Sequence, residues 1–474
     1  MIFYESKFSM ILPEHFCSRM NEILGTEFQE FQNSLEQEAI TTIRVNTSKY
    51  KETPRLDQIN YCSTGYSIPK RPIFTLDPFI HSGIYYVQEP SSMFLEQIMK
   101  QLNFDHRIKA LDLCASPGGK STHLSSLLPA NSLLVANDVI RSRSQILSEN
   151  LKKWGDENVI VTNNDPHDFQ RLPDFFDLIL VDAPCSGEGL FRRDPNAIEE
   201  WSPDNAQLCA QRQQRILADV WPALKEGGIL IYSTCTFNTA ENEDNIQWLN
   251  EFAEIENVPL EISAEWGITT SEINGFSGYR FYPHKVVGEG LFIAVVQKGG
   301  NGKDSDKRKA KDHQLNASKA EKEFARELLI PGEFEILKFE NSLLTLPSIH
   351  MNDFNHVKSN LRIVHAGVKV GEIKQNDLIP NHDFALSRIL NRQAYPEIDL
   401  TIEEALRYLK RDEISPISSD KGWNLVTYRD MPLGWVKNLG NRYNSAFPKE
   451  WRIRMSITEF TGDKLENEMI KFPF

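Results

Sequence analysis

The chain has 474 residues, of which 40% are hydrophobic and 25% are charged, and its formal net charge is −14. At about 150 residues per domain, this length predicts about three domains. The negative charge argues against indiscriminate binding to polyanions, although a local basic face would still allow nucleic acid to bind.

The start of the chain and the cysteine pattern indicate in which cellular compartment the protein is expected. The first residues lack the basic region and apolar run of a signal peptide, and no apolar run reaches the length of about 18 residues that a membrane span needs. We expect a cytoplasmic, monomeric protein with no membrane partner. The six cysteines show no CxxC pair and no metal-ligand spacing to histidine, so reduced thiols are expected rather than disulfides or a structural zinc site.

Residues 1–83 mix aromatic and charged positions around a strand-like piece at 43–47, which predicts a small α+β module. Arg44 in that piece is equally consistent with a plain surface residue and with an RNA contact. The segment Tyr86–Met93 (YVQEPSSM) then leads into an apolar helix pattern. Ser91 or Ser92 is the natural cap of that helix.

From residue 108 onward, short apolar runs alternate with helical patterns, which predicts a doubly wound, mostly parallel, Rossmann-like sheet over 84–298. The predicted strands are 110–113, 133–136, 159–161, 178–181, 229–232 and 291–296. Helices are predicted to begin near Lys120, Arg141, Asp204 and Ala240. Ligands of such folds bind over the carboxyl ends of the strands.

The C-terminal part is predicted to contain a charged linker at 299–320, a small mixed module at 321–385 and a β-rich domain at 386–474. A plain solvated linker is favoured over an RNA-binding tether. The terminal domain should have a helix at 401–410 and strands at 423–428, 433–436 and 451–455. Cations and aromatic rings alternate over 429–454, which favours an RNA-binding surface over a core with solvated charges. They are Arg429, Lys437, Arg442, Lys449, Arg452 and Arg454, with Tyr428, Trp435, Tyr443 and Trp451.

A glycine-rich turn, Asp112–Lys120 (DLCASPGGK), follows the first strand of the sheet and opens a helix. Such a turn binds NAD, a phosphate or S-adenosylmethionine, and the absence of GxGxxG weakens the dinucleotide interpretation. Asp138 ends the second strand, where an acid would bind a ribose diol, and Asp165 ends the third, where a carboxylate would accept from an adenine amino group. Three successive strand ends together favour a nucleoside site.

Two further strand ends carry thiols among polar neighbours. VDAPCSG places Asp182 and Cys185 after one strand, and STCT places Cys235 after the next, whereas Cys209 lies on the apolar side of a helix. Two thiols, an aspartate and a nucleoside cofactor fit methylation at carbon-5 of a pyrimidine, in which a thiolate adds to carbon-6 and a carboxyl group assists at nitrogen-3. Spacing alone does not assign the nucleophile, and the Pro-Cys context, as in DNA cytosine methyltransferases, favours Cys185.

In this order, DLCASPGGK, VDAPCSGEG and STCTF resemble the Sun-type RNA (cytosine-5)-methyltransferases, and YVQEPSSM and GYRFYPHKVVGEGLF fit the flanking motifs of that family. The runs GEIKQNDLIPNHDFAL, WNLVTYRDMPLGWVK and FPKEWRIRM are similar to the RsmF/YebU-like 16S ribosomal RNA subgroup, which ends in a PUA-like RNA-binding domain. The resemblance implies that Cys235 is the nucleophile, that Cys185 helps to release the product, and that Asp182 acts at the target base. It also implies an S-adenosylmethionine site made of Cys114, Ala115, Ser116, Pro117, Gly118, Gly119, Lys120, Asp138, Asp165 and Asp182.

The sequence therefore predicts an S-adenosylmethionine-dependent enzyme that forms 5-methylcytosine in small-subunit (16S) ribosomal RNA, with N-terminal and PUA-like modules that bind the RNA. A transfer RNA substrate is the alternative within the same chemistry. An inactive ribosome-assembly factor is an alternative of another class, and the presence of both cysteines with Asp182 argues against it. A nicotinamide-dependent oxidoreductase is the least favoured, given the glycine pattern.

Overall fold

The computed structural model describes residues 10–300, 317–374, 377–415 and 418–457, together with 465, 469, 470 and 472. The predicted linker at 299–320 therefore falls largely outside the described residues. In the described part of the chain, no helix combines the length and the apolar character needed to cross a membrane.

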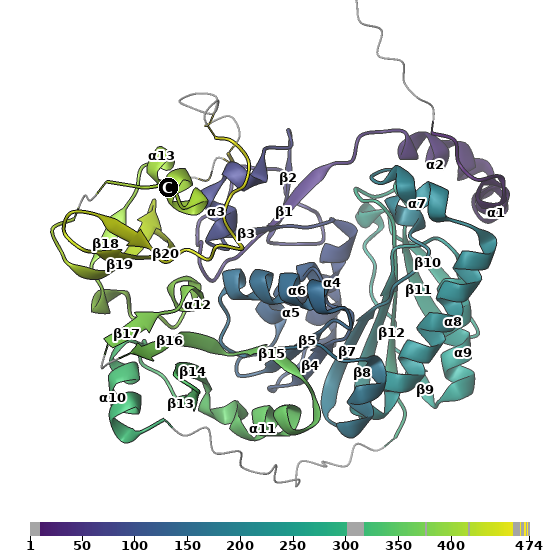
Figure 1. Cartoon of the computed structure of the whole chain (residues 1–474). Helices are drawn as coiled ribbons and strands as arrows, with labels where there is room; N and C mark the ends of the chain where they lie inside the picture. Colours follow the sequence, from purple (N-terminus) through teal and green to yellow (C-terminus); the bar gives the residue numbers. More distant parts are fainter. Residues whose placement is uncertain are drawn as a thin grey trace, which may run out of the picture.

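The N-terminal module consists of two helices, α1 (Glu14–Leu24) and α2 (Phe28–Leu35), and a small antiparallel sheet. The sheet has the order β2 (Gly65–Ile68), β1 (Thr41–Val45), β3 (Tyr85–Val87), and a short helix, α3 (Pro78–His81), lies beside it. The helices α1 and α2 lie apart from the sheet of this module. α1 and α2 pack through Phe16 and Phe31 on Phe191 and Phe237 of the following domain, away from the sheet (Figure 1).

The central domain is built on a sheet with the order β10-β11-β12-β8-β7-β4-β5-β6-β15. Its parallel centre contains β4 (Lys109–Asp112), β5 (Leu133–Asn137), β6 (Val159–Thr162), β7 (Phe176–Asp182) and β8 (Leu224–Thr234). Antiparallel strands extend one side: β9 (Ile255–Asn257), β10 (Thr269–Ile273), β11 (Phe276–Phe281) and β12 (Leu291–Lys298). All six strands predicted for this domain are confirmed, and so is the Rossmann-like class of the sheet.

Helices cover both faces of the sheet (Figure 1), because consecutive residues of its parallel strands are apolar and both faces must be buried. In β7, Ile179 and Val181 belong to one core cluster, while Leu178 and Leu180 belong to another. The first cluster includes residues of α8 (Pro203–Val220) and α9 (Glu243–Phe252). The second includes residues of α4 (Leu95–Leu102), α5 (Gly119–Leu127) and α6 (Arg141–Trp154), and a short helix, α7 (Pro195–Glu200), precedes α8.

The serine cap predicted before α4 is wrong. Ser91 and Ser92 lie inside a 3-10 turn that runs directly into the helix, so their own backbone amides need acceptors. The Glu89 carboxylate accepts from both amides, at 3.0 and 2.9 Å. An acidic side chain thus takes the capping role at this positive end of the helix dipole.

The 321–385 region contributes a strand to the central sheet. β15 (Ile363–Ala366) pairs antiparallel with β6 and covers its outer edge. The remaining strands, β13 (Phe334–Phe339), β14 (Ser342–Pro347), β16 (Val368–Lys374) and β17 (Asp377–Pro380), form a separate antiparallel sheet with α10 (Lys319–Glu327), α11 (Met351–Asn360) and α12 (His382–Leu386) nearby. An edge strand that is paired in this way offers no free ladder to other chains.

The C-terminal domain is β-rich, as predicted, with β18 (Glu397–Asp399), β19 (Gly422–Tyr428), β20 (Met431–Asn438), β21 (Tyr443–Ser445) and α13 (Ile402–Lys410). The strand predicted at 451–455 is wrong, since these residues form turns and loop. Most rings proposed to stack on RNA bases are instead in the core: Tyr428, Trp435 and Tyr443 are no more than 8% exposed. The cations that alternate with them, including Arg442, Lys449 and Arg452, are exposed and remain available to phosphates.

The N-terminal and C-terminal sheets share one hydrophobic core. Ile43, Tyr85 and Phe79 belong to the same buried cluster as Val426 and Leu433. Figure 1 shows the two sheets side by side above the central domain. Segments nearly 400 residues apart in sequence therefore stabilise one another.

Both interpretations of Arg44 are wrong, because its side chain is fully buried. The guanidinium donates to Gln88 Oε1 at 2.7 Å and to Thr122 Oγ1 at 2.5 Å, and it lies 4.3 Å from the ring centre of Trp154. Burial lowers the pKa of Arg44 to about 10. The arginine joins β1 to α5 and α6 inside the protein and is not available to RNA.

We predict that Arg44→Met lowers the free energy of unfolding by about 2–4 kcal/mol, because it removes hydrogen bonds of a charged donor and leaves the buried acceptor atoms of Gln88 and Thr122 without this donor. Thermal unfolding followed by circular dichroism measures the effect. The matched control is Arg442→Met, at an exposed position. Equal melting temperatures for the two variants would contradict the prediction.

Candidate active site

The glycine-rich turn lies between β4 and α5, at the carboxyl edge of the parallel strands. Gly118 occupies the N-cap of α5 with φ +115°, a backbone conformation that disfavours L side chains. A Cβ atom on Gly119 would lie 3.3 Å from the Tyr86 ring. The two glycines thus let the start of α5 approach a narrow space without side chains in the way.

That space is a cavity of about 200 Å³. Its walls come from the glycine-rich turn, from the end of β7, and from β3 with the segment that follows it. They contain Tyr86, Val87, Gln88, Glu89, Ser92, Asp112, Cys114, Ala115, Ser116, Pro117, Gly119, Lys120 and Asp182. The contribution of Gln88 and Glu89 was not predicted from the sequence. Their position in YVQEPSSM, immediately before α4, gave no sign that this segment folds over the turn.

Asp112, the last residue of β4, is fully buried, and its Oδ1 has no hydrogen-bond partner among the described residues. Its Oδ2 accepts from Ser121 at 2.6 Å. Burial, reinforced by Asp182, raises the pKa of Asp112 to about 7 even though the Ser121 hydrogen bond opposes the shift. A cationic group in the cavity would satisfy the free oxygen and favour the carboxylate.

Asp138 and Asp165 follow β5 and β6, as predicted, but the cavity lining does not include either residue. Asp138 is buried, accepts from the backbone of Ile140 at 2.8 Å and pairs with Arg143 at 3.3 Å. Asp165 caps the following 3-10 helix and pairs with Arg215 at 3.3 Å. Asp138 contributes to the field that raises the pKa of Asp112, whereas the contacts of Asp165 are those of a capping residue.

Asp182 stands at the end of β7, lines the cavity and precedes the loop that carries Cys185. Its two oxygens are held separately, one by Ser233 Oγ at 2.8 Å and the other by Lys120 Nζ at 2.9 Å. The side chain is still 34% exposed. Although burial opposes it, the ion pair with Asp182 raises the pKa of Lys120. The carboxylate is therefore fixed in direction and open to a ligand.

The thiols of Cys185 and Cys235 lie 3.1 Å apart, Sγ to Sγ. β7 and β8 are parallel neighbours with Asp182 opposite Ser233, so the loops that carry the cysteines leave the sheet side by side. A hydrogen bond to Cys235, followed by burial, raises the pKa of Cys185 well above its ordinary value. A raised pKa favours the protonated form of the Cys185 thiol.

Two buried glutamates that the sequence did not single out hold these loops. Glu188 accepts from Arg19 at 2.6 Å, from Trp201 Nε1 at 2.9 Å and from the Phe237 amide at 3.0 Å. Glu241 accepts from the Ser186 amide at 2.9 Å. Their place beside the two cysteine motifs was the only available signal, since a charged residue in a loop is ordinarily solvated.

A Rossmann-like sheet with a glycine turn, acidic strand ends and a cavity over the carboxyl edge defines the class of S-adenosylmethionine-dependent methyltransferases. The residues fit this cofactor, because a free carboxylate oxygen and further acids face a ligand that carries positive charge. The comparisons agree. Residues 12–90 match the N-terminal domain of 16S rRNA methyltransferase RsmF, residues 99–297 match 16S rRNA methyltransferase RsmB/F, and residues 395–453 match the RsmF PUA domain. The chain belongs to the RsmB/F methyltransferase family.

Similar proteins span almost the whole chain. Ribosomal RNA small subunit methyltransferase F of Aliivibrio fischeri (strain MJ11) is 29% identical, with 93% of this chain and 98% of the relative covered. The protein of the same name from Escherichia coli O157:H7 is 28% identical, with 93% and 97% covered.

Solved structures resemble part of the chain. A methyltransferase homolog from Pyrococcus horikoshii is 27% identical with a TM-score of 0.52, and 62% of this chain and 100% of that chain are covered. The structure of NSun6 from the same organism with SFG has a TM-score of 0.52 at 21% identity, with the same coverage, and supports the fold.

We predict that S-adenosylmethionine binds more weakly as the pH falls below 7, by up to about tenfold for each pH unit, because a proton on Asp112 must leave before its carboxylate can meet the cationic cofactor. Calorimetric titration between pH 6 and 8 measures the affinity and the released proton. Asp112→Asn should bind weakly with no such dependence. The same pH dependence in that variant would show that another group is responsible.

Proposed function

We propose that this protein uses S-adenosylmethionine to form 5-methylcytosine in 16S ribosomal RNA through a covalent bond between Cys235 and the pyrimidine. The observation that carries the proposal is the pair of thiols 3.1 Å apart, next to Asp182 at the wall of the cofactor cavity. Binding of RNA alone requires neither thiol. The relatives that cover nearly all of the chain are named as methyltransferases of small-subunit ribosomal RNA, which supports this substrate.

Carbon-5 of cytosine is a poor nucleophile, so the reaction needs prior activation of the ring. In the proposed step, the Cys235 thiolate forms a bond to carbon-6, and the electron pair of the carbon-5 to carbon-6 double bond becomes available at carbon-5. In the same step, a proton carried by the Asp182 carboxyl group passes to nitrogen-3 and neutralises the negative charge that develops on the ring. The bound cofactor supplies the methyl group that carbon-5 attacks.

The raised pKa of Cys185 argues against Cys185 as the nucleophile and leaves Cys235 for that role. The pKa of Cys185 is raised mainly by its hydrogen bond to Cys235, so Cys185 is disfavoured as the attacking thiolate and is placed to donate to Cys235 Sγ. Lys120 adds a cation whose field reaches Cys235. This supports the assignment that the family resemblance implies and argues against the Pro-Cys alternative.

Cys185 gains its own role once the covalent bond exists. When Cys235 Sγ is bonded to carbon-6, it no longer carries the charge that holds the proton on Cys185, so Cys185 ionises more readily. The new thiolate lies beside the adduct and is positioned to take the carbon-5 proton. The electron pair of that carbon–hydrogen bond re-forms the ring double bond, and the bond between carbon-6 and Cys235 breaks.

The target cytosine must unstack from its neighbouring bases to reach this pocket, so the protein must also bind the flanking RNA. We propose that the exposed cations of the C-terminal domain, Arg442, Lys449, Arg452 and Arg454, contact phosphates, while its buried rings serve the core. We also propose that the protein acts in the cytoplasm, where ribosomal RNA is the available substrate.

We predict that Cys235→Ala abolishes methyl transfer, by at least about 10³-fold, and leaves binding of S-adenosylmethionine unchanged, because the cavity lining does not include Cys235. Transfer of a radiolabelled methyl group to 16S ribosomal RNA measures activity, and calorimetry measures binding. Cys209→Ala, a buried cysteine on α8, is the matched control and should stay active. Activity of Cys235→Ala close to that of the control would exclude the proposed nucleophile.

We predict that Cys185→Ala still forms the bond to carbon-6 but releases the product slowly, so that a covalent complex with RNA accumulates. A denaturing gel after incubation with RNA and cofactor shows this complex as a slowly migrating band. The double variant with Cys235→Ala should not form the band. If Cys235→Ala alone traps RNA and Cys185→Ala does not, the two roles must be exchanged.

A further inference from the structure

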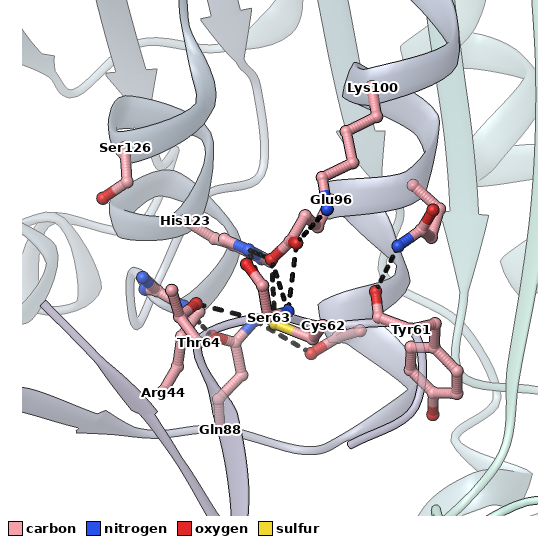
Figure 2. A network of polar contacts seen from close by, with 12 residues as sticks. Arg44, Tyr61, Cys62, Ser63, Thr64, Gln88, Glu96, Lys100, His123 and Ser126 are labelled. Atoms are coloured by element: carbon pink, nitrogen blue, oxygen red, sulfur yellow. Dashed lines mark hydrogen bonds and ion pairs between the residues drawn. The ribbon is translucent and has the colours of Figure 1, made fainter. Parts of the chain in front are cut away.

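A second group of chemically reactive side chains lies between the N-terminal module and helices α4 and α5. Cys62 precedes β2, Glu96 lies in the first turn of α4 and His123 lies one turn into α5, and none is more than 1% exposed. Figure 2 shows the three side chains pointing toward one another. Within the part of the chain that the structure describes, this is the one group of three such side chains with ligand atoms close enough to share a metal ion.

The distances suit a single ion. Cys62 Sγ lies 3.2 Å from Glu96 Oε2 and 4.0 Å from His123 Nε2. The distance between Glu96 Oε2 and His123 Nε2 is 3.8 Å. An ion about 2.1 Å from each atom would touch all three, which falls within the roughly 2.0–2.3 Å of zinc bonds to sulfur, nitrogen and oxygen. Thr64 Oγ1, 3.6 Å from the sulfur, is a neutral oxygen within reach of a fourth position.

Hydrogen bonds from neighbouring residues orient the Glu96 carboxylate, as hydrogen bonds to the ligands do in known metal sites. Ser63 donates its amide to both Glu96 oxygens, at 3.0 and 3.1 Å, and Lys100 Nζ donates to Oε1 at 2.6 Å. These contacts hold the carboxylate with Oε2 turned toward the thiol and the imidazole (Figure 2). Fixing the first ligands in this way is a general feature of protein metal sites.

Without an ion, the buried histidine is poorly satisfied. His123 Nδ1 has no hydrogen-bond partner among the described residues, and Nε2 has only the long contacts of 3.8 and 4.0 Å. Burying a polar ring without good partners costs free energy, and a metal bond at Nε2 would offset this cost.

We propose that Cys62, Glu96 and His123 bind one zinc ion that ties the N-terminal module to the cofactor-binding helix. Sulfur, nitrogen and oxygen together suit this borderline ion better than the hard cations. On binding, the Cys62 thiol loses its proton to solvent, so the thiolate and the Glu96 carboxylate balance the two charges of the ion. A neutral site adds no further positive charge next to Arg44, which is buried close by and whose charge acts on His123.

The test is the metal content of the full chain. Protein produced without a histidine tag in zinc-supplemented medium and then dialysed should carry about one zinc per chain by elemental analysis. Cys62→Ser and His123→Ala should each lose at least about nine-tenths of it, whereas Cys209→Ser, also a buried cysteine, should keep it. Cys235→Ser should keep it as well, which separates this site from the neighbouring thiol pair.

A second measurement does not depend on the folding of the variants. Wild-type protein stripped with a chelator and titrated with cobalt(II) should develop a thiolate-to-metal charge-transfer band that saturates at one equivalent, and zinc should restore the thermal stability lost on stripping. Protein without zinc and without that band would overturn the proposal. Zinc that is kept in Cys62→Ser and lost in Cys235→Ser would also overturn it, in favour of metal at the catalytic thiols.

Discussion

The register between β7 and β8 is the constraint on which the active site depends. With Asp182 opposite Ser233, the two strands end at the same level, and each continues into a loop that carries a thiol. The contact of 3.1 Å between those thiols then follows from parallel pairing, and buried glutamates fix the loops that provide it. A change of register by one residue would turn every side chain of a strand to the other face, which would disrupt the core and separate the two thiols.

The ends of the chain form a single support for the catalytic sheet. The N-terminal and C-terminal sheets share a core, and β15 covers the edge of β6. Removing the region after residue 298 would therefore expose apolar surface and an open strand edge as well as removing candidate RNA contacts. Loss of RNA binding in such a truncation would not identify an RNA-binding surface, and substitution of single exposed cations is the cleaner approach.

Polar residues that the structure buries connect the parts of the protein. Arg44 joins β1 to α5 and α6, and the Cys62, Glu96 and His123 group joins the same module to the start of α4 and α5. Arg44 and this group both contact α5, and the first turn of that helix, at Gly119 and Lys120, lines the cofactor cavity. The N-terminal module thus has a physical route by which its packing supports cofactor binding, independently of any contact with RNA.

The sequence by itself determined the alternation of strands and helices, the glycine turn and the placement of acids and thiols at strand ends, because these depend on local periodicity and on short motifs. It could not show that Arg44 is buried, that the rings of the terminal domain belong to its core, or that Glu89 caps α4, since each depends on which distant segment covers the residue. Glu96 lies 34 positions after Cys62 in the sequence, and His123 lies 61 positions after it. Such separations match no short metal-binding motif. Only the tertiary structure brings these three residues together, because packing of β2, α4 and α5 places their side chains in one interior space.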